Sequence, residues 1–229
     1  MGTVSLIVAT ELKSQALEAR CLELLPISTD TFVGREGELD TVEKALNPGN
    51  PGQKGMVLYG LPGAGKSQLA LRYIGRHREQ FTSIFWITAS SAETTSSSFS
   101  EAARLIASSW PGKDLPNTYD GQDDRRMVLS RLRSTTKRNW LLVIDSADDL
   151  QGQDFTQCVP ACPHGSFLVT SIRREAADIF GTESLEIGGL DAKSGQQLLI
   201  ARLRKRTNTI FSSEEGKPTW YCRWLNRRP

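Results

Sequence analysis

The stretch "VLYGLPGAGKSQLALRY" (57–73) places three glycines, a proline, a lysine and a serine between an apolar run and an amphipathic stretch. It fits the pattern G-x-x-x-x-G-K-[ST], with Gly60, Gly65, Lys66 and Ser67 at the fixed positions. Glycines let the backbone curl so that successive N–H groups point at one anion, and a following helix adds its positive dipole end. The pattern therefore predicts a phosphate-binding loop between a strand and a helix.

The residues of this loop have separate predicted roles. Lys66 is expected to reach the β and γ phosphates of a nucleotide, and the Ser67 hydroxyl is expected to hold Mg²⁺. The flanking sequence agrees, since the β-prone "MVLYG" (56–60) follows a turn-rich stretch and apolar residues follow the loop at helical spacing. From the pattern alone, a glycine-rich turn that binds nothing is the alternative. The residues expected to contact the nucleotide here are Gly60, Pro62, Gly63, Ala64, Gly65, Lys66, Ser67 and Gln68.

The bulk composition is typical of an intracellular globular protein. The chain has 229 residues, 38% of them hydrophobic and 24% charged, which suits one α/β domain or slightly more. A net charge of +2 gives no indication of nucleic-acid or membrane binding. The apolar "VSLIVA" (4–9) is too short to span a bilayer. We expect a cytoplasmic protein.

The four cysteines do not indicate a disulfide framework in an intracellular chain. "CVPACPH" (158–164) brings two cysteines and His164 close together, which raises the alternative of a zinc site. A fourth ligand would have to come from the distant Cys21 or Cys222. The favoured interpretation is a turn-rich loop with two small buried side chains.

A second informative stretch is "NWLLVIDSADDL" (139–150), in which an apolar run ends in Asp145. A buried parallel strand presents such a carboxylate at the carboxyl end of the sheet. Beside a phosphate-binding loop, Asp145 is expected to help Ser67 hold Mg²⁺. The alternative is an aspartate that merely begins a turn.

A third stretch, "SFLVTSI" (166–172), is followed at once by Arg173, which from the tip of a strand beside the loop strand could sense the γ-phosphate. Apolar strand-like runs and helical patterns alternate along the chain. Such alternation predicts an α/β fold, here the three-layer sandwich of P-loop NTPases, with a parallel sheet of about five strands flanked by helices.

Four stretches taken together resemble a known family. "FVGRE" (32–36), "GLPGAGKS" (60–67), "LLVIDSADD" (141–149) and "FLVTSIRR" (167–174) occur in the order typical of STAND NTPases, most closely the NB-ARC branch. The resemblance covers about residues 32–210. It implies that Val33 and its neighbour Gly34 contact adenine and that Arg35 lies near the nucleotide.

Two departures from the family pattern affect catalysis. Ser146 stands where many members carry an acidic or amide residue, and Asp148 and Asp149 follow three and four residues after Asp145. By resemblance to the related NACHT pattern, one of these two could orient the attacking water.

The second departure is Ile172, which occupies the place of the usual sensor arginine, with Arg173 one residue late. A shift of one residue on a strand reverses its face.

The resemblance also implies a domain organisation. Residues 31–210 are expected to form the nucleotide-binding domain and residues 1–30 a partly helical, linker-like extension. Family members continue into a helical and a winged-helix subdomain, whereas residues 211–229 resemble neither. This tail is expected to be disordered or aberrant, so that the chain is truncated after the nucleotide-binding subdomain.

The function implied is an ATP/ADP-binding module that acts as a nucleotide-dependent signalling switch, with protein partners and, if it is an enzyme, slow ATP hydrolysis. One alternative is a stand-alone P-loop ATPase or small-molecule kinase. Another is a non-hydrolysing, truncated regulatory fragment.

Overall fold

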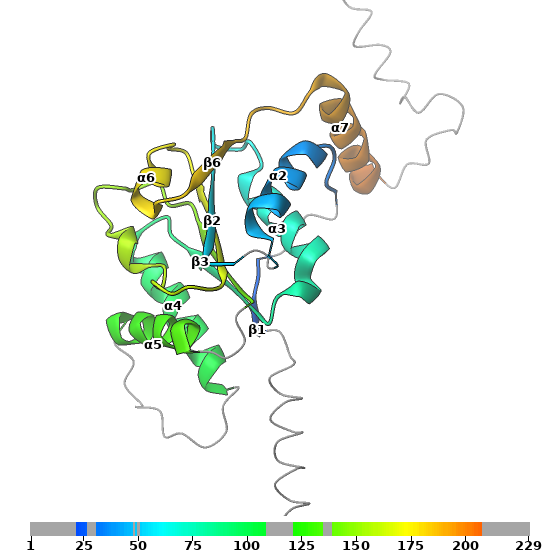
Figure 1. Ribbon diagram of the computed structural model, residues 1–229. Coiled ribbons are helices and arrows are strands. Elements are labelled where there is room, and N and C mark those ends of the chain that lie inside the picture. Colours follow the sequence, from blue (N-terminus) through cyan, green and yellow to red (C-terminus); the bar gives the residue numbers. More distant parts are fainter. Residues whose placement is uncertain are drawn as a thin grey trace, which may run out of the picture. The chain divides into compact units, whose positions relative to one another are not determined.

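The computed structural model describes residues 22–26, 31–47, 49, 51–108, 121–134 and 139–207. It divides into two compact units (Figure 1), one made of residues 1–28 with 36–188 and the other of residues 29–35 with 189–229. The first unit holds the sheet and the helices that cover it. The second holds the segment before the first described helix together with α7 (Ala192–Thr207).

A parallel sheet of six strands forms the centre of the first unit. Its spatial order is β1-β3-β4-β5-β2-β6, and every neighbouring pair is parallel. β5 therefore lies between the loop strand β2 and the Asp145 strand β4. The strands are β1 (Leu22–Leu24), β2 (Lys54–Tyr59), β3 (Ser83–Thr88), β4 (Trp140–Asp145), β5 (Ser166–Ser171) and β6 (Glu183–Glu186).

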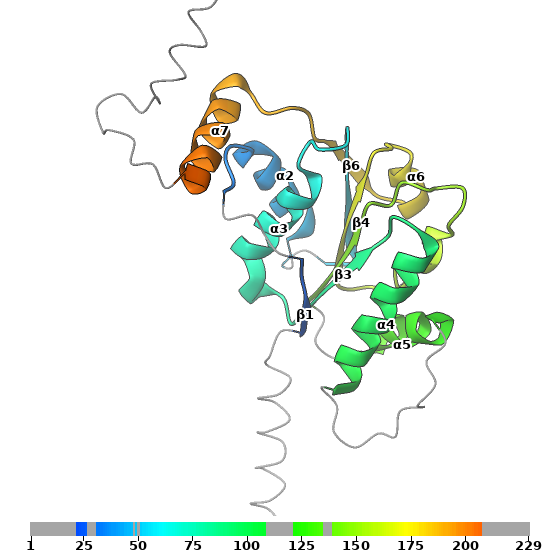
Figure 2. The same ribbon diagram turned by 180° about the vertical axis from the view of Figure 1, so that it is seen from behind.

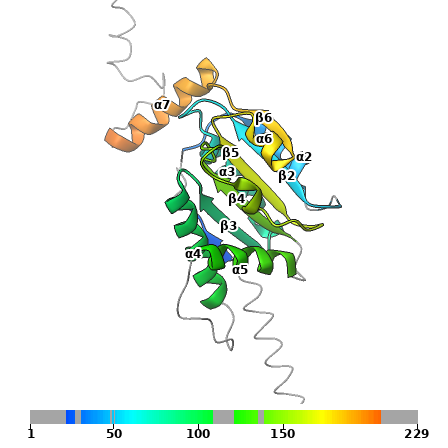
Figure 3. The same cartoon turned by 90° about the vertical axis from the view of Figure 1, so that its left-hand side faces the viewer.

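Helices cover both faces of the sheet (Figures 1 and 2). α2 (Glu36–Leu46) and α3 (Lys66–His77) lie on one face, and α4 (Ala92–Ser108), α5 (Gly121–Ser134) and α6 (Ala176–Phe180) lie on the other. Two short 3₁₀ turns, η1 (Arg78–Gln80) and η2 (Phe155–Gln157), join these elements. The view onto the face of the sheet in Figure 3 shows α4, α5 and α6 in front of the strands. The predicted three-layer α/β sandwich is confirmed.

The core lies on both faces of the sheet, and one cluster of buried side chains joins the strands to α4, α5 and α6. The central strands are buried on both faces, as expected for near-continuous apolar runs in a parallel sheet. Trp140 is fully packed, and its indole Nε1 donates to the carbonyl of Leu132 at 3.1 Å. Gly165 has a φ of +80°, and a Cβ there would lie 2.1 Å from the Trp140 ring, so only glycine fits before β5.

Two elements differ from the sequence-based expectation. β1 comes from residues 22–24, inside the segment expected to be a linker-like extension, and pairs with β3 in parallel. A strand of three residues at a sheet edge has too little periodicity to be recognised from its sequence. At the other edge, "SLEIGGL" (184–190) predicts a strand of up to seven residues, whereas β6 covers Glu183–Glu186 only.

α4 begins at Ala92, within a stretch rich in serine and threonine. Ser91 explains this start, because its Oγ accepts from the backbone N–H of Thr94 at 3.2 Å while Thr94 Oγ1 accepts from the N–H of Ser91 at 2.9 Å. This reciprocal pair is a capping box with threonine in the place of the usual glutamate. The hydroxyl residues therefore begin the helix.

Candidate functional site

The loop between β2 and α3 is built on left-handed glycines. Gly60, Gly63 and Gly65 have φ values of 146°, 78° and 95°. Gly65 is the N-cap of α3, and its carbonyl accepts from the N–H of Leu69 at 2.9 Å. A curled loop of this kind, leading directly into a helix N-terminus, provides the backbone N–H groups for an anion.

Unlike Gly63, Gly60 packs closely against its neighbours. A Cβ at this position would lie 2.4 Å from the backbone carbonyl oxygen of Ile187, the residue after β6. Ile187 in turn donates its N–H to the carbonyl of Tyr59 at 2.7 Å. The start of the loop is thus packed against the end of the neighbouring strand, which leaves no room for a side chain.

Lys66 lies over its own loop. Its Nζ donates to the carbonyl oxygens of Gly60 at 2.8 Å and Leu61 at 3.1 Å. The ammonium group is therefore held against the first residues of the loop, where its positive charge adds to the positive dipole at the N-terminus of α3.

Ser67 and Asp145 come together across the sheet, as predicted. Ser67 Oγ donates to Asp145 Oδ1 at 2.6 Å, although 78 residues separate them in the chain. α3 brings the hydroxyl and β4 brings the carboxylate to the same carboxyl end of the sheet. A hydroxyl and a carboxylate oxygen are hard donors that suit Mg²⁺, so the residues present fit that ion.

Thr170, which the sequence analysis did not single out, completes this cluster. Its hydroxyl donates to Asp145 Oδ1 at 2.6 Å and accepts from the N–H of Ser146 at 2.9 Å, and the side chain is buried. Thr170 lies on β5, between β4, which carries Asp145, and β2, which leads through the loop into α3 and Ser67. In the sequence, Thr170 stands at the end of an apolar run, inside the family stretch "FLVTSIRR" (167–174), but its contact with Asp145 depends on the order of strands in the sheet.

The residue after Asp145 has an unusual backbone conformation. Ser146 has a φ of 64°, in the left-handed region that residues other than glycine rarely adopt. Its N–H is held by Thr170, and the next N–H, of Ala147, donates to the Thr170 carbonyl at 2.9 Å. β5 therefore fixes the direction in which the chain leaves β4.

Asp148 and Asp149 make different contacts. Asp148 Oδ1 accepts from the N–H of Ile172 at 2.8 Å and from Ser171 Oγ at 3.2 Å, so it joins the loop after β4 to the end of β5. Asp149 Oδ1 accepts from the N–H of Gly152 at 2.9 Å, inside its own turn. Both contacts are structural, and the catalytic role predicted for one of these acids stays a prediction.

Arg173 follows β5 and is exposed, and its N–H donates to Ser171 Oγ at 3.1 Å. Ile172, in the place of the usual sensor arginine, is 43% exposed. The predicted role of Arg173 at the γ-phosphate stays a prediction.

Val33, Gly34 and Arg35 belong to the second unit. Gly34 and Arg35 are both left-handed, with φ values of 73° and 66°, so the chain turns sharply before α2. Within that unit a Cβ on Gly34 would lie 2.7 Å from Ser194 Oγ. The contacts of these three residues with adenine or nucleotide stay predictions.

The alternative of a zinc site receives no support. Among the residues that the structure describes, no group of three or more His, Cys, Asp or Glu side chains is placed to hold a metal ion. Cys158 is buried, and burial raises the pKa of its thiol to about 11, while the Cys162 thiol donates to the carbonyl of His164 at 3.3 Å. Cys21, Cys222 and the predicted tail at 211–229 lie outside the described residues.

Comparisons with known proteins agree with this geometry. The sequence profile of the AAA ATPase domain matches residues 31–162, more than half of the chain. A nucleotide-binding leucine-rich repeat (NLR)-like protein of Hyaloscypha variabilis is 30% identical over 205 residues, which cover 81% of this chain and 20% of that protein. The chain thus spans about a fifth of the length of this curated relative.

A solved structure shares the fold. The ORC1 protein of Aeropyrum pernix, solved in complex with DNA, has a TM-score of 0.52 at 17% identity and covers 77% of this chain and 51% of its own. A STAND protein with a tetratricopeptide repeat sensor from Pyrococcus horikoshii has a TM-score of 0.49 at 19% identity. That match covers 81% of this chain and 27% of the Pyrococcus chain.

The fold and the loop define a P-loop NTPase. The chain belongs to the AAA ATPase domain family, and it carries a nucleotide-binding domain of that kind. The family and the NLR-like relative confirm the STAND-class P-loop NTPase expected from the four sequence stretches. Within the described residues, no helix is long and apolar enough to cross a membrane.

Proposed function

We propose that this domain binds ATP and ADP with Mg²⁺ and acts as a nucleotide-dependent switch within a signalling protein. The observation that carries the proposal is the convergence of Lys66, Ser67 and Asp145 at one end of the sheet, with the Ser67–Asp145 oxygens 2.6 Å apart. The NLR-like relative supports a signalling context. In that context the partners would be other proteins, and the compartment would be the cytoplasm.

Each group has a distinct task in the proposed binding. The loop N–H groups at Gly63, Ala64 and Gly65 would surround the β-phosphate, and Lys66 would neutralise the β and γ oxygens. Ser67 and Asp145 would hold Mg²⁺, which when bound neutralises phosphate charge. Thr170 would keep the Asp145 carboxylate turned toward Ser67.

We propose that hydrolysis, where it occurs, is slow. Ser146 has no carboxylate to activate a water molecule, and the carboxylate of Asp148 accepts two hydrogen bonds from the end of β5. The proposed site would still bind the nucleotide and neutralise the phosphate charge. It would lack a positioned general base, a group that typically raises a reaction rate by about 10²–10⁴-fold. A switch that must persist in one state is compatible with slow turnover.

Calorimetry with the Lys66→Ala variant tests the binding site. Losing a charge-assisted contact to the phosphates should weaken Mg-ATP and Mg-ADP binding by about 100-fold. Lys193→Ala, which removes an exposed lysine outside the loop, is the matched control. Unchanged affinity in Lys66→Ala, with an unchanged thermal unfolding midpoint, would rule out this loop as the nucleotide site.

The nucleotide that co-purifies with the protein tests the switch. Denaturing the purified protein and separating the released nucleotide should give ADP, the expected ligand of a resting state. Release of phosphate to water, with none transferred to an added acceptor, separates this function from that of a small-molecule kinase. ATP that binds but is never hydrolysed would favour the non-hydrolysing fragment.

A further inference from the structure

β6 forms one edge of the sheet. In the part of the chain that the structure describes, its strand partner is β2 alone, through the register Met56↔Glu183 to Tyr59↔Glu186. The strand has four residues, of which the first and last are exposed glutamates. Its outer side therefore carries backbone groups that no other described strand pairs.

The direction of the β6 backbone groups follows from one hydrogen bond. The N–H of Ile187 points to β2, since it donates to the Tyr59 carbonyl at 2.7 Å. Amide groups of successive residues in a strand point to opposite sides. The N–H and C=O groups of Ser184 and Glu186 are thus directed away from β2, in position to pair with an added strand.

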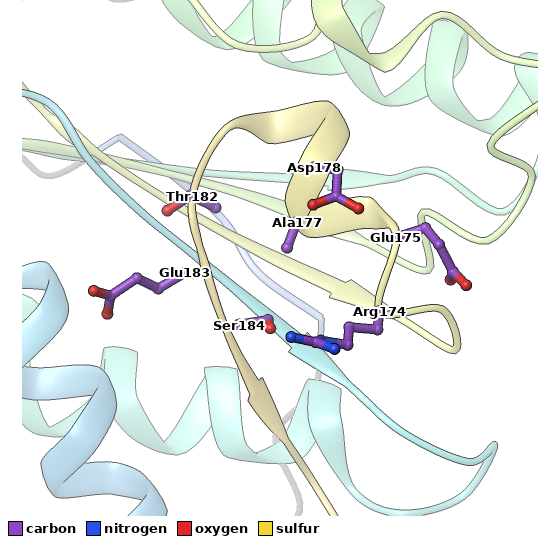
Figure 4. Close-up of a pocket in the computed structure, with 7 residues that line it drawn as sticks. All are labelled: Arg174, Glu175, Ala177, Asp178, Thr182, Glu183 and Ser184. Atoms are coloured by element: carbon purple, nitrogen blue, oxygen red, sulfur yellow. The ribbon is translucent and has the colours of Figure 1, made fainter.

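A hollow of about 570 Å³ lies beside β6 on the α6 face of the sheet. Figure 4 shows Asp178 and Arg174 on one side of it and Thr182 and Ser184 on the other, with Glu183 extending away from them. Glu183 is turned away, and of the other charged lining residues Glu175 and Asp178 are acidic and Arg174 is basic, so the net charge of this hollow favours a cationic side chain. The residues that line it are Arg174, Glu175, Ala177, Asp178, Thr182, Glu183 and Ser184.

A second hollow, of about 450 Å³, adjoins β6 and is lined by residues of α2 and β2. Lys44 and Lys54 line it together with Thr41 and a single acid, Glu183. Partial burial lowers the pKa of the Lys54 ammonium, which reflects an incompletely solvated cation. This hollow favours an anionic side chain.

We propose that the β6 edge binds an extended peptide segment of a partner protein, which adds a seventh strand and carries an acidic side chain between two basic ones. Side chains of a strand alternate between the two faces of a sheet, and hollows for alternate side chains are what gives strand addition its specificity. The acid would enter the Lys44–Lys54 hollow, and its basic neighbours would enter the acidic hollow beside α6. Charge complementarity thus selects both the partner and its register.

A second copy of this chain fits the edge poorly. Pairing of two β6 strands would gather four exposed glutamates, Glu183 and Glu186 of each copy, along one short seam. Like charges opposite one another destabilise strand pairs. The sequence of the edge therefore disfavours self-association and leaves it for a partner with basic residues.

The test uses a fluorescein-labelled peptide, Thr-Val-Thr-Lys-Glu-Lys-Thr-Val-Thr, and the full chain, with affinity measured by fluorescence anisotropy. A control peptide exchanges the charges to Glu-Lys-Glu. Ser184→Pro removes an outward N–H while leaving the bonds to β2, because proline is tolerated on an edge strand where its nitrogen faces out. Lys44→Glu/Lys54→Glu reverses the charge of one hollow, and Lys193→Glu is the matched control at an exposed site.

The expected result is binding of the first peptide that weakens by about tenfold or more in Ser184→Pro and in the double lysine variant, and stays unchanged in Lys193→Glu. The exchanged peptide should bind as weakly as the first peptide binds the double variant. If Ser184→Pro shows a lowered unfolding midpoint, a peptide N-methylated on alternate residues replaces it and should lose binding. The proposal would be overturned if the first peptide did not bind the unaltered chain. It would also be overturned if binding were unaffected by both Ser184→Pro and N-methylation of the peptide, or if the protein formed dimers that exclude the peptide.

Discussion

Two loops follow the carboxyl ends of two inner strands of the sheet, one after β2 and one after β4, and they are held in different ways. The loop after β2 takes its shape from three glycines, with φ values of 146°, 78° and 95°. The loop after β4 adopts a left-handed turn without glycine, at Ser146, and is held by side chains of β5. Glycine allows the first conformation locally, whereas the second depends on a neighbouring strand. Substitutions in the two loops should therefore destabilise the protein for different reasons.

The largest expected effect is in the first loop, at Gly60. Gly60→Ala places a Cβ 2.4 Å from the carbonyl oxygen of Ile187 in a left-handed backbone, and we expect it to lower the free energy of unfolding by about 3 kcal/mol. Gly63→Ala is the matched control, because that glycine is also left-handed but a Cβ there meets nothing within 4 Å. We expect its cost to be about 1 kcal/mol.

Urea unfolding of both variants measures the difference. Equal losses at the two positions would mean that backbone conformation alone restricts the loop. The packing of Gly60 against the end of β6 would then have no energetic weight.

The next effect is in the second loop, at Thr170. Thr170→Val keeps the shape of the side chain but removes the hydroxyl that bonds Asp145 and Ser146. Leaving buried polar groups unpaired should lower the free energy of unfolding by about 2 kcal/mol. It should also weaken the dependence of ATP binding on Mg²⁺, because the Asp145 carboxylate loses the group that orients it.

Calorimetry with and without Mg²⁺ separates the two consequences for Thr170→Val. Thr156→Val, at an exposed hydroxyl that bonds Asp154, is a control that should leave nucleotide binding unchanged. A Thr170→Val protein with unaltered stability would show that the hydroxyl is dispensable for the loop after β4.

The same contrast explains what could be predicted from the sequence. The first loop was recognised, with its helix, because glycines and Lys66 have a fixed local spacing. The pairing of Ser67 with Asp145 also followed, because strands of a parallel sheet end at the same edge. The part played by Thr170 could not be foreseen, since it requires β5 to lie between β2 and β4, and strand order is not contained in a local pattern.

The edges of the sheet were the least predictable elements. β1 has three residues and β6 has four, and each is held by pairing with one neighbour rather than by its own pattern. Asp148 is a similar case at the site. Its spacing from Asp145 suggested catalysis, whereas its contacts with Ile172 and Ser171 became visible only in the folded chain.

A smaller effect is expected at Asp148. Asp148→Ala removes the acceptor that joins the loop after β4 to the end of β5 and should cost about 1 kcal/mol of unfolding free energy. Asp148→Asn keeps an acceptor oxygen and should unfold almost as the unaltered protein does. Phosphate release by the asparagine variant should match the unaltered rate if the carboxylate serves the loop. A lost rate at unchanged stability would instead assign Asp148 to water activation.

The smallest effect, and one of opposite sign, is expected at Ser146. Its φ of 64° is costly for a residue with a Cβ and free of steric cost for glycine. Ser146→Gly removes that strain but makes the unfolded chain more flexible, and the balance should raise the free energy of unfolding by about 0.5 kcal/mol. Ser146→Ala, which keeps the Cβ, should show no gain. If glycine and alanine behave alike in urea unfolding, the left-handed turn at Ser146 stores no strain.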